Sequence, residues 1–304
     1  MSVLRLSAIQ LCSVPDVEQN LATISRELTA LCTEVSTGDL VDNDDEHIVV
    51  LPECCLFFGG KDAEQLSLAR KTAGANSLIN RLSALARQFK ITLVAGTVPL
   101  LSDCGEKFTN SSCVFSAQGE LIGQYDKIHL FDANVNTNTN ANANANANVN
   151  DNDNNYLEST YTQAGKSVTV VKPEKVNIGL SVCYDVRFPL LYRQLTTQGA
   201  TVITVPSAFT RVTGSAHWQT LLQSRAIENQ IYIIAAAQEG IHANGRETWG
   251  HSMIISPWGD ILAFKDKGEG YITSFYLQEE INRVRAAMPV HEHNKFTVEL
   301  KSYE

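Results

Sequence analysis

The chain has 304 residues, of which 44% are hydrophobic and 19% are charged, and its formal net charge is −9. A chain of this length forms one large domain or two small ones and buries roughly three quarters of its unfolded surface. The excess of 33 acidic over 24 basic residues argues against nucleic-acid binding, which needs clustered positive charge. No apolar run approaches the roughly 18–20 residues that span a membrane. Seven irregularly spaced cysteines and an N-terminus without a leader pattern favour a cytoplasmic protein with reduced thiols.

The first third of the chain alternates between strand and helix patterns. Alternating or uninterrupted apolar residues predict strands at residues 3–11, 47–51 and 91–98. Apolar residues at three- and four-residue spacing predict amphipathic helices at 17–35 and 75–89. This succession of strand and helix is typical of an α/β protein.

The rest of the chain adds hairpins to that pattern. We expect hairpins at 112–117 with 120–130, 168–172 with 176–183 and 252–256 with 261–264, helices at 190–198 and 218–229, and strands at 200–205 and 231–237. Crossovers mixed with hairpins indicate an α/β fold with mixed sheets and helices outside them. No shift of composition divides residues 1–304, so we predict a single domain.

One segment, residues 133–155, has Asn at nearly every second position. Asn favours neither helix nor strand, and its Ala and Thr neighbours bury too little apolar area to offset the entropy of ordering. We predict a tolerated surface insertion, since loop length reduces stability only slowly. The other interpretation is an aggregation-prone or recognition tract, because Asn-rich sequences can form β-ladders.

Cys183 closes the predicted strand at 176–183 and is followed by Tyr-Asp-Val-Arg-Phe-Pro and a helix. A nucleophile on a strand-to-helix turn is exposed at the sheet edge, where backbone N–H groups and the helix N-terminus stabilise a developing oxyanion. The same field is expected to lower the pKa of the thiol and favour the reactive thiolate. The alternative is a small buried hydrophobic residue, which describes most free cysteines.

Two more ionisable residues lie at ends of predicted strands. Glu53 follows the apolar strand at 47–51, where a carboxylate loses part of its hydration and suits the role of general base. Lys127 lies near the end of the strand at 120–130. Taken singly, the glutamate fits a helix cap or a surface ion pair, and the lysine fits a solvated strand end. Together with a thiol at one sheet edge, they form a reaction centre with separate base, nucleophile and oxyanion stabiliser.

The segments Leu51-Pro-Glu53, Lys127-Ile-His-Leu-Phe-Asp132 and Cys183-Tyr-Asp-Val-Arg187-Phe-Pro resemble the three catalytic motifs of the nitrilase superfamily, the carbon–nitrogen hydrolases. The resemblance runs from about residue 3 to 264 and is interrupted by 133–155. It implies a four-layer αββα sandwich that forms a homodimer or a higher homo-oligomer. It also implies four catalytic residues, with Glu53 as general base, Lys127 as stabiliser of the tetrahedral intermediate, Cys183 as nucleophile and Glu158 as a second glutamate.

Further segments narrow the branch. Residues 206–209, 213–218, 225–230, 235–238 and 250–259 resemble the amidase subgroup that contains deaminated glutathione amidase and omega-amidase, and the run around Gln238 is closer to the former. The resemblance implies hydrolysis of a small aliphatic amide through a cysteine thioester, with release of ammonia. The alternatives are an omega-amidase acting on amides like 2-oxoglutaramate, a carbamoylase, a nitrilase and a non-enzymatic scaffold. The intact catalytic residues weigh against the scaffold.

Three residues are predicted to bind the substrate. Tyr184 offers its backbone N–H to the oxyanion, and Phe209 lines the pocket. Arg187 lies four residues after the nucleophile and holds a substrate carboxylate in a bidentate grip. Its other interpretation is a structural partner of Asp185 or Glu158.

We expect neither a metal nor another cofactor. The histidines are scattered, and the adjacent cysteines at 54–55 have no second pair at metal-ligand spacing. The partner that the sequence implies is a small-molecule amide, with neither nucleic acid nor membrane.

Overall fold

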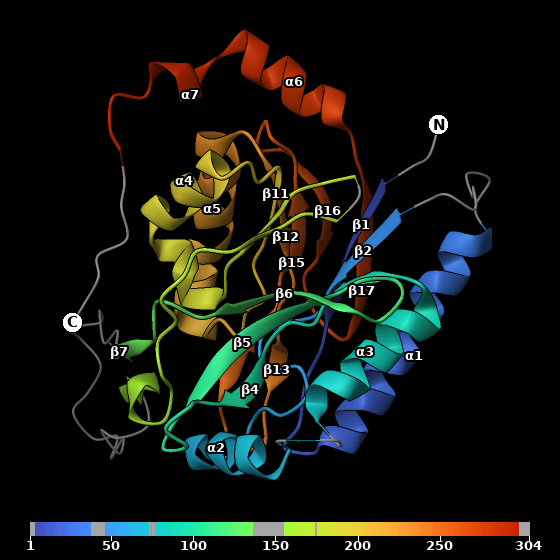
Figure 1. Cartoon of the computed structure of the whole chain (residues 1–304), viewed down its shortest axis with the longest axis vertical. Coiled ribbons are helices and arrows are strands. Elements are labelled where there is room, and N and C mark those ends of the chain that lie inside the picture. The colour runs from blue at the N-terminus through green and yellow to red at the C-terminus, as the bar shows by residue number, and fades with distance from the viewer. Residues whose placement is uncertain are drawn as a thin grey trace, which may run out of the picture.

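The computed structural model describes residues 4–37, 46–72, 74, 77–135, 155–173 and 175–297, and most of its strands form two mixed sheets (Figure 1). The first sheet has the order β17 (Gly270–Tyr276), β1 (Leu4–Gln10), β2 (Glu46–Val50), β3 (Thr92–Val94), β5 (Phe108–Phe115) and β4 (Val98–Leu101), and β6 (Leu121–Asp126) also pairs with β5. The second has the order β16 (Ile261–Lys265), β15 (Ser252–Ile255), β12 (Tyr232–Ala235), β11 (Val202–Thr204), β10 (Ile178–Leu180) and β9 (Val170–Val171). Two short pairs stand apart: β7 (Asp132–Asn134) with β8 (Asn155–Leu157), and β13 (Glu239–Ile241) with β14 (Glu247–Trp249).

Helices cover the outer faces of the sheets. Figure 1 shows α1 (Val17–Thr37) and α3 (Leu78–Phe89) on one flank and α4 (Pro189–Thr197) and α5 (Arg211–Asn229) on the other. The apolar side chains of α1 and α3 pack against the first sheet, and those of α4 and α5 join the cluster that includes the second sheet. The order helix, sheet, sheet, helix confirms the four-layer αββα sandwich. The remaining helices are α2 (Asp62–Lys71), α6 (Gln278–Ala287), α7 (Val290–His293) and the 3₁₀ turns η1 (Glu158–Thr160) and η2 (Cys183–Arg187).

Strand β1 illustrates how the sequence produces these layers. Leu4, Leu6 and Ala8 belong to the cluster shared with the second sheet, whereas Ile9 and Leu11 belong to the cluster under α1 and α3. Side chains alternate between the faces of a strand, so a strand covered on both faces is apolar at odd and even positions. Full burial of each large aliphatic side chain contributes about 1.5–3 kcal/mol.

The parallel strands bring three loops to one place. β2 runs parallel to β1 and β3, and β11 runs parallel to β10 and β12. Glu53 follows β2, Cys183 follows β10, and residues 206–208 follow β11. Ligands of open α/β sheets bind beyond the carboxyl ends of the strands. These loops are therefore the expected position of a site.

The predicted strands and helices are present, with two notable shifts of boundary. α5 begins at Arg211 rather than at residue 218, because Thr210 caps it by accepting a hydrogen bond from the Thr213 N–H. The predicted strand at 91–98 divides into β3 and β4. The reason is Gly96, which has a φ of +53° and lies so close to the Pro52 carbonyl that a Cβ would come within 1.9 Å of its oxygen.

Several elements were not predicted from the sequence, among them α2, α6, α7 and the pair β13 and β14. β17 lies beyond the resemblance and pairs antiparallel with the whole of β1, from Leu4 opposite Tyr276 to Gln10 opposite Gly270. The predicted insertion at 133–155 lies mostly outside the described residues, but its two ends pair as β7 and β8. None of the helices in the described ranges has the length and apolar character that crossing a membrane requires.

Candidate active site

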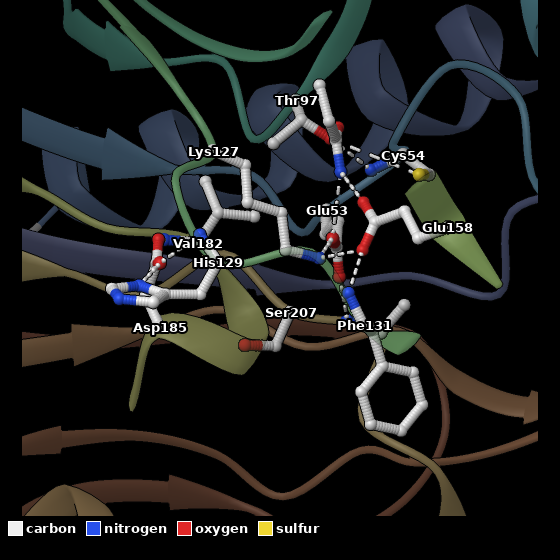
Figure 2. Close-up of polar contacts among 12 residues, drawn as sticks. Glu53, Cys54, Thr97, Lys127, His129, Phe131, Glu158, Val182, Asp185 and Ser207 are labelled. Atoms are coloured by element: carbon white, nitrogen blue, oxygen red, sulfur yellow. Dashed lines mark hydrogen bonds and ion pairs between the residues drawn. The ribbon is translucent and has the colours of Figure 1, made fainter. Parts of the chain in front are cut away.

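The predicted base, amine and nucleophile meet in one pocket. Figure 2 shows Lys127 between two carboxylates, and its Nζ donates to Glu53 Oε1 at 2.9 Å and to Glu158 Oε2 at 2.8 Å. The pocket is lined by these three residues and by Cys183. The side chains of Glu53 and Lys127 are only 6% and 2% exposed. A buried ion pair of this kind is expensive to break, because removing one partner leaves an uncompensated charge.

The local chain geometry fixes the position of Glu53. After Pro52 the chain turns at Cys54, whose φ is +54° and whose N–H donates to Thr97 Oγ1 at 2.8 Å. The second carboxylate oxygen of Glu53, Oε2, accepts the Ala208 N–H at 2.9 Å. The base is therefore tied to the loop after β11 in the second sheet.

Asn110 is a member of the site that the sequence analysis missed. Its Nδ2 lies on β5 and donates to Glu53 Oε1 at 3.0 Å and to Glu158 Oε1 at 3.3 Å. The signal was the run Thr109-Asn110-Ser111-Ser112, which is fully polar inside an otherwise apolar strand and wholly buried. A buried polar run needs partners, and here one of its members holds both glutamates.

Glu158 lines the same pocket and contacts Lys127. It begins the η1 turn directly after β8, and its Oε2 also accepts the Phe131 N–H at 2.7 Å. Three donors, from Lys127, Asn110 and Phe131, therefore hold a carboxylate whose side chain is 18% exposed. These three contacts fix the position of the carboxylate.

The expected ionisation of Cys183 is wrong. Cys183 has a φ of +48° and begins the single 3₁₀ turn η2, not a full helix. Burial raises the pKa of its thiol well above the usual value, and the neighbouring charge of Glu53 raises it further, against a smaller opposing effect of Lys127. The raised pKa favours a neutral thiol in the resting protein.

The amine remains charged. Burial by itself would lower the pKa of Lys127, but the charges of Glu158 and Glu53 raise it well above its usual value. With a neutral thiol, the ionised groups at the inner end of the pocket are two carboxylates and one ammonium. A resting thiolate would add a further negative charge to a buried site that already has an excess of one, which low polarity opposes.

A second buried carboxylate joins the nucleophile turn to the lysine turn. Asp185 is fully buried; its Oδ2 accepts from Tyr125 Oη and the Val182 N–H, both at 2.8 Å. Its Oδ1 accepts from the His129 N–H at 3.2 Å and lies 2.6 Å from the His129 ring Nδ1 (Figure 2). Asp185 stands two residues after Cys183, and His129 two residues after Lys127. This network was not predicted from the sequence. The signal was the equal spacing in Lys-Ile-His and Cys-Tyr-Asp, which places His129 and Asp185 each two residues after a candidate catalytic residue.

The three predicted substrate-binding residues form a cluster beside the pocket and not its lining. The Tyr184 ring packs edge-on against Phe131, with centroids 5.0 Å apart, and Phe131 lines the pocket. The Arg187 guanidinium lies 5.1 Å above the Phe209 ring and 3.2 Å from His217 Nδ1. Within the described part of the chain Arg187 forms no ion pair, so its interpretation as a partner of Asp185 or Glu158 is wrong. The binding roles of Tyr184, Arg187 and Phe209 stay predictions.

The structure shows no clustered metal ligands at this site. Across the described residues, no three His, Cys, Asp or Glu side chains are grouped so that they could hold a metal ion.

The catalytic geometry agrees with a family comparison. The model of the carbon-nitrogen hydrolase family matches residues 5–286. The chain belongs to this family. The match includes β17, which the resemblance read from the sequence had left out, and family membership makes the chain an amidohydrolase of the nitrilase superfamily.

The curated relatives that the chain resembles are amidases. It is 34% identical to the deaminated glutathione amidase of Yersinia enterocolitica, over 97% of this chain and 94% of that protein. It is 37% identical to the enzyme of the same name from Synechocystis, over 95% and 97%. It is also 32% identical to an omega-amidase of Saccharomyces cerevisiae, over 84% of each chain.

Solved structures show the same fold. The C. elegans NitFhit protein superposes with a TM-score of 0.82 at 30% identity, covering 100% of this chain and 69% of that one. Nit3 of Saccharomyces cerevisiae, described as a member of branch 10 of the nitrilase superfamily, superposes with a TM-score of 0.80 at 28% identity, covering 97% of both chains.

Proposed function

We propose that the chain hydrolyses amides of 2-oxo dicarboxylic acids through a thioester on Cys183, with deaminated glutathione as the first candidate substrate. The observation that carries the proposal is the set of Glu53, Lys127 and Glu158 contacts beside Cys183 in one pocket. The names of the relatives from Yersinia enterocolitica and Synechocystis support the choice of substrate.

In the first half-reaction Glu53 takes the thiol proton while Cys183 Sγ attacks the amide carbon. The carbonyl oxygen becomes an oxyanion, which the Lys127 ammonium and the Tyr184 N–H stabilise. Loss of one such donor raises the barrier by about 3–4 kcal/mol. The proton then passes from Glu53 to the amide nitrogen, the C–N bond breaks, and the amine departs. The acyl group remains on Cys183 as a thioester.

In the second half-reaction Glu53 takes a proton from water, and the water oxygen attacks the thioester carbon. The C–S bond breaks, the acid is released, and the proton returns from Glu53 to the thiol sulfur. Glu53 changes its charge in both halves. Glu158 holds Lys127 through a separate 2.8 Å contact, so the ammonium keeps an anionic partner while Glu53 is neutral.

The leaving group depends on the amide. A primary amide such as 2-oxoglutaramate releases ammonia, as the sequence analysis expected. Deaminated glutathione releases the dipeptide cysteinylglycine, because the nitrogen of its scissile amide belongs to a cysteinyl residue. An assay of ammonia alone therefore misses the first candidate substrate, and the formation of 2-oxoglutarate must be followed for both.

Arg187 is proposed to bind the carboxylate on the acyl side of the substrate. Its guanidinium lies beside the His217 ring and the faces of the Tyr184 and Phe209 rings, and burial lowers its pKa. An incoming carboxylate would compensate that loss of hydration. Arg187→Lys keeps the charge but loses the bidentate geometry, so we expect KM for carboxylate-bearing amides to rise at least about tenfold. Butyramide, which has no carboxylate, serves as the control substrate; an unchanged KM for 2-oxoglutaramate contradicts this role.

The specific alternative is an omega-amidase, which the Saccharomyces cerevisiae relative of that name favours. A panel on purified protein separates the two, comparing kcat/KM for deaminated glutathione and for 2-oxoglutaramate by formation of 2-oxoglutarate. A higher value for deaminated glutathione supports the first candidate, and a higher value for 2-oxoglutaramate supports the omega-amidase.

The mechanism itself is tested by Cys183→Ala. We expect a folded protein, with an unchanged far-ultraviolet circular dichroism spectrum and no turnover of either amide. Turnover by this variant rules out the thioester mechanism, whichever substrate is preferred.

We also propose that the protein acts in the cytoplasm as a homodimer or a higher homo-oligomer. The thiols of Cys55, Cys113 and Cys183 are free. Large apolar side chains are exposed on the edge strand β16 and the turn before it, with Trp258 48%, Leu262 42% and Phe264 46% exposed. Contact with a second copy would remove this apolar surface from water. Sedimentation velocity should find an oligomer that Leu262→Ser weakens; a wild-type monomer at micromolar concentration contradicts it.

A further inference from the structure

The pocket continues outward beyond the groups that carry the chemistry. Three of its lining segments are exposed or half-buried at most positions and are called the outer pocket: residues 59–62 at the start of α2, residues 156–157 of β8, and residues 246–248 in and before β14. The proposed mechanism uses none of them. Within these three segments, Lys61 and Arg246 are basic and Asp62 and Glu247 are acidic.

The Arg246 side chain makes only a long ion pair. Its Nη2 lies 3.4 Å from Asp62 Oδ1 and 3.5 Å from Oδ2, which is longer than the 2.7–2.9 Å of a charge-assisted hydrogen bond. Its guanidinium lies 5.0 Å above the ring of Tyr156, and its side chain is 32% exposed. Stacking on the ring holds the planar group in place, while most of its five donors remain available.

The other charges around the mouth leave Arg246 without a close anionic partner. Glu247 is paired with Arg211 at 2.9 Å, and Asp62 makes only the long contact described above. Lys61 forms no ion pair with any residue that the structure describes. The outer pocket therefore has two cations and two carboxylates; Glu247 is paired with Arg211, whereas Asp62 makes only the long contact with Arg246.

The two ends of the pocket differ in charge. The inner end has two carboxylates against one ammonium, an excess of one negative charge, as described for the catalytic groups. An anionic group on a bound substrate is therefore repelled from the inner end and attracted to the mouth. A substrate with its scissile amide at Cys183 would direct a carboxylate of its leaving group outward.

We propose that Arg246, stacked on Tyr156 and assisted by Lys61, binds the terminal carboxylate of a peptide leaving group. This inference rests on the proposed function and refines it: the pocket selects secondary amides whose amine half is a short peptide over primary amides, whose amine half is ammonia. Arg246 exchanges its long contact with Asp62 for a short bidentate one with the substrate.

The test compares two substrates on Arg246→Gln. Deaminated glutathione has the leaving-group carboxylate and 2-oxoglutaramate lacks it, while the acyl half of both is the same. We expect KM for deaminated glutathione to rise about tenfold or more, as for a lost hydrogen bond to a charged group, and both constants for 2-oxoglutaramate to stay within about twofold. The matched control is Arg70→Gln, which removes an arginine that donates to the Gly105 carbonyl and is outside the pocket lining; it should change neither.

A capped substrate tests whether the terminal carboxylate is the group that Arg246 binds. Deaminated glutathione with its terminal carboxylate converted to an amide should bind wild type as poorly as Arg246→Gln binds the free acid, and the substitution should cause no further loss with the capped compound. Equal losses on free and capped compounds, or on both substrates, overturn the proposal.

A binding measurement separates this proposal from the proposed function. Calorimetry on Cys183→Ser and on Cys183→Ser with Arg246→Gln measures affinity for deaminated glutathione without turnover. Weaker binding by the double variant supports the subsite even if wild type proves inactive on that compound. Equal affinity of the two overturns the subsite, whatever the activity of the wild type.

Discussion

The substitution Asp185→Asn tests whether the buried carboxylate places the nucleophile. The two oxygens of Asp185 have different partners. Oδ2 accepts hydrogen bonds from the Tyr125 hydroxyl and the Val182 N–H, and Oδ1 contacts the His129 ring and accepts the His129 N–H. An amide replaces one of these oxygens by an NH₂ group. The Tyr125 hydroxyl or the His129 ring can turn to accept from that group, but a backbone N–H cannot.

One backbone N–H therefore loses its acceptor in either orientation of the amide. It is that of Val182, next to Cys183, or that of His129, two residues from Lys127. A buried unsatisfied donor costs about 1–3 kcal/mol, and the other bonds lose the assistance of a charge. We expect the free energy of unfolding to fall by about 2–4 kcal/mol in urea denaturation.

Catalysis should suffer beyond this loss of stability. A misplacement of about 1 Å in a reacting group can cost roughly a hundredfold in rate, so we expect kcat per folded enzyme to fall about 10–100-fold while KM changes less than about threefold. The control is Asp126→Asn, beside Lys127, whose contacts from Ser111 and Gln124 both reach Oδ1 and survive in the amide. An Asp185→Asn enzyme that is destabilised but keeps its kcat would show that the carboxylate supports the fold alone.

Two further predictions concern the thiol and the insertion. The charge of Glu53 helps to raise the pKa of Cys183, so Glu53→Gln should lower the pH at which alkylation of Cys183 by iodoacetamide reaches half its maximal rate, while amide turnover is lost. Peptide mapping distinguishes Cys183 from the exposed Cys104. An unchanged or raised midpoint pH refutes the stated cause. Deletion of residues 137–152 shortens the connection between β7 and β8 roughly fivefold, which should stabilise the protein by about 1.4 kcal/mol through loop closure. The deletion should leave kcat/KM for 2-oxoglutaramate within about twofold of the wild-type value. A tenfold loss of kcat/KM would show that the tract contributes to the site.

The sequence predicts the catalytic groups better than it predicts what holds them. Glu53 and Cys183 each follow an apolar run that reads as a buried strand, and parallel strands bring their ends together, so local pattern and topology suffice. Glu158 has no such pattern and was placed by resemblance alone. The contacts of Asn110 connect it with residues 57 and 48 positions away, and no local periodicity encodes such a distance.

The ionisation of Cys183 also depends on contacts that the local sequence does not reveal. A strand-to-helix turn suggested a lowered pKa for the thiol, since a helix N-terminus favours a negative charge. The chain makes only one 3₁₀ turn there and places the carboxylate of Glu53 beside the sulfur. Burial is the largest cause of the raised pKa, and the charge of Glu53, which comes from the other sheet, adds to it.

A neutral resting thiol gives the proposed reaction a constant charge. When the proton moves from Cys183 to Glu53, the negative charge moves from the carboxylate to the sulfur and then to the oxyanion, and no charge enters or leaves the buried end of the pocket. Lys127 contacts Glu53 at 2.9 Å and is proposed to contact the oxyanion, so the same ammonium lies beside the negative charge before and after the attack. Creating a net charge in a poorly hydrated site is costly; moving one within reach of a fixed ammonium is much less so. The raised pKa of the thiol therefore favours a step in which proton transfer and attack occur together, and it explains why the base and the lysine must be in direct contact.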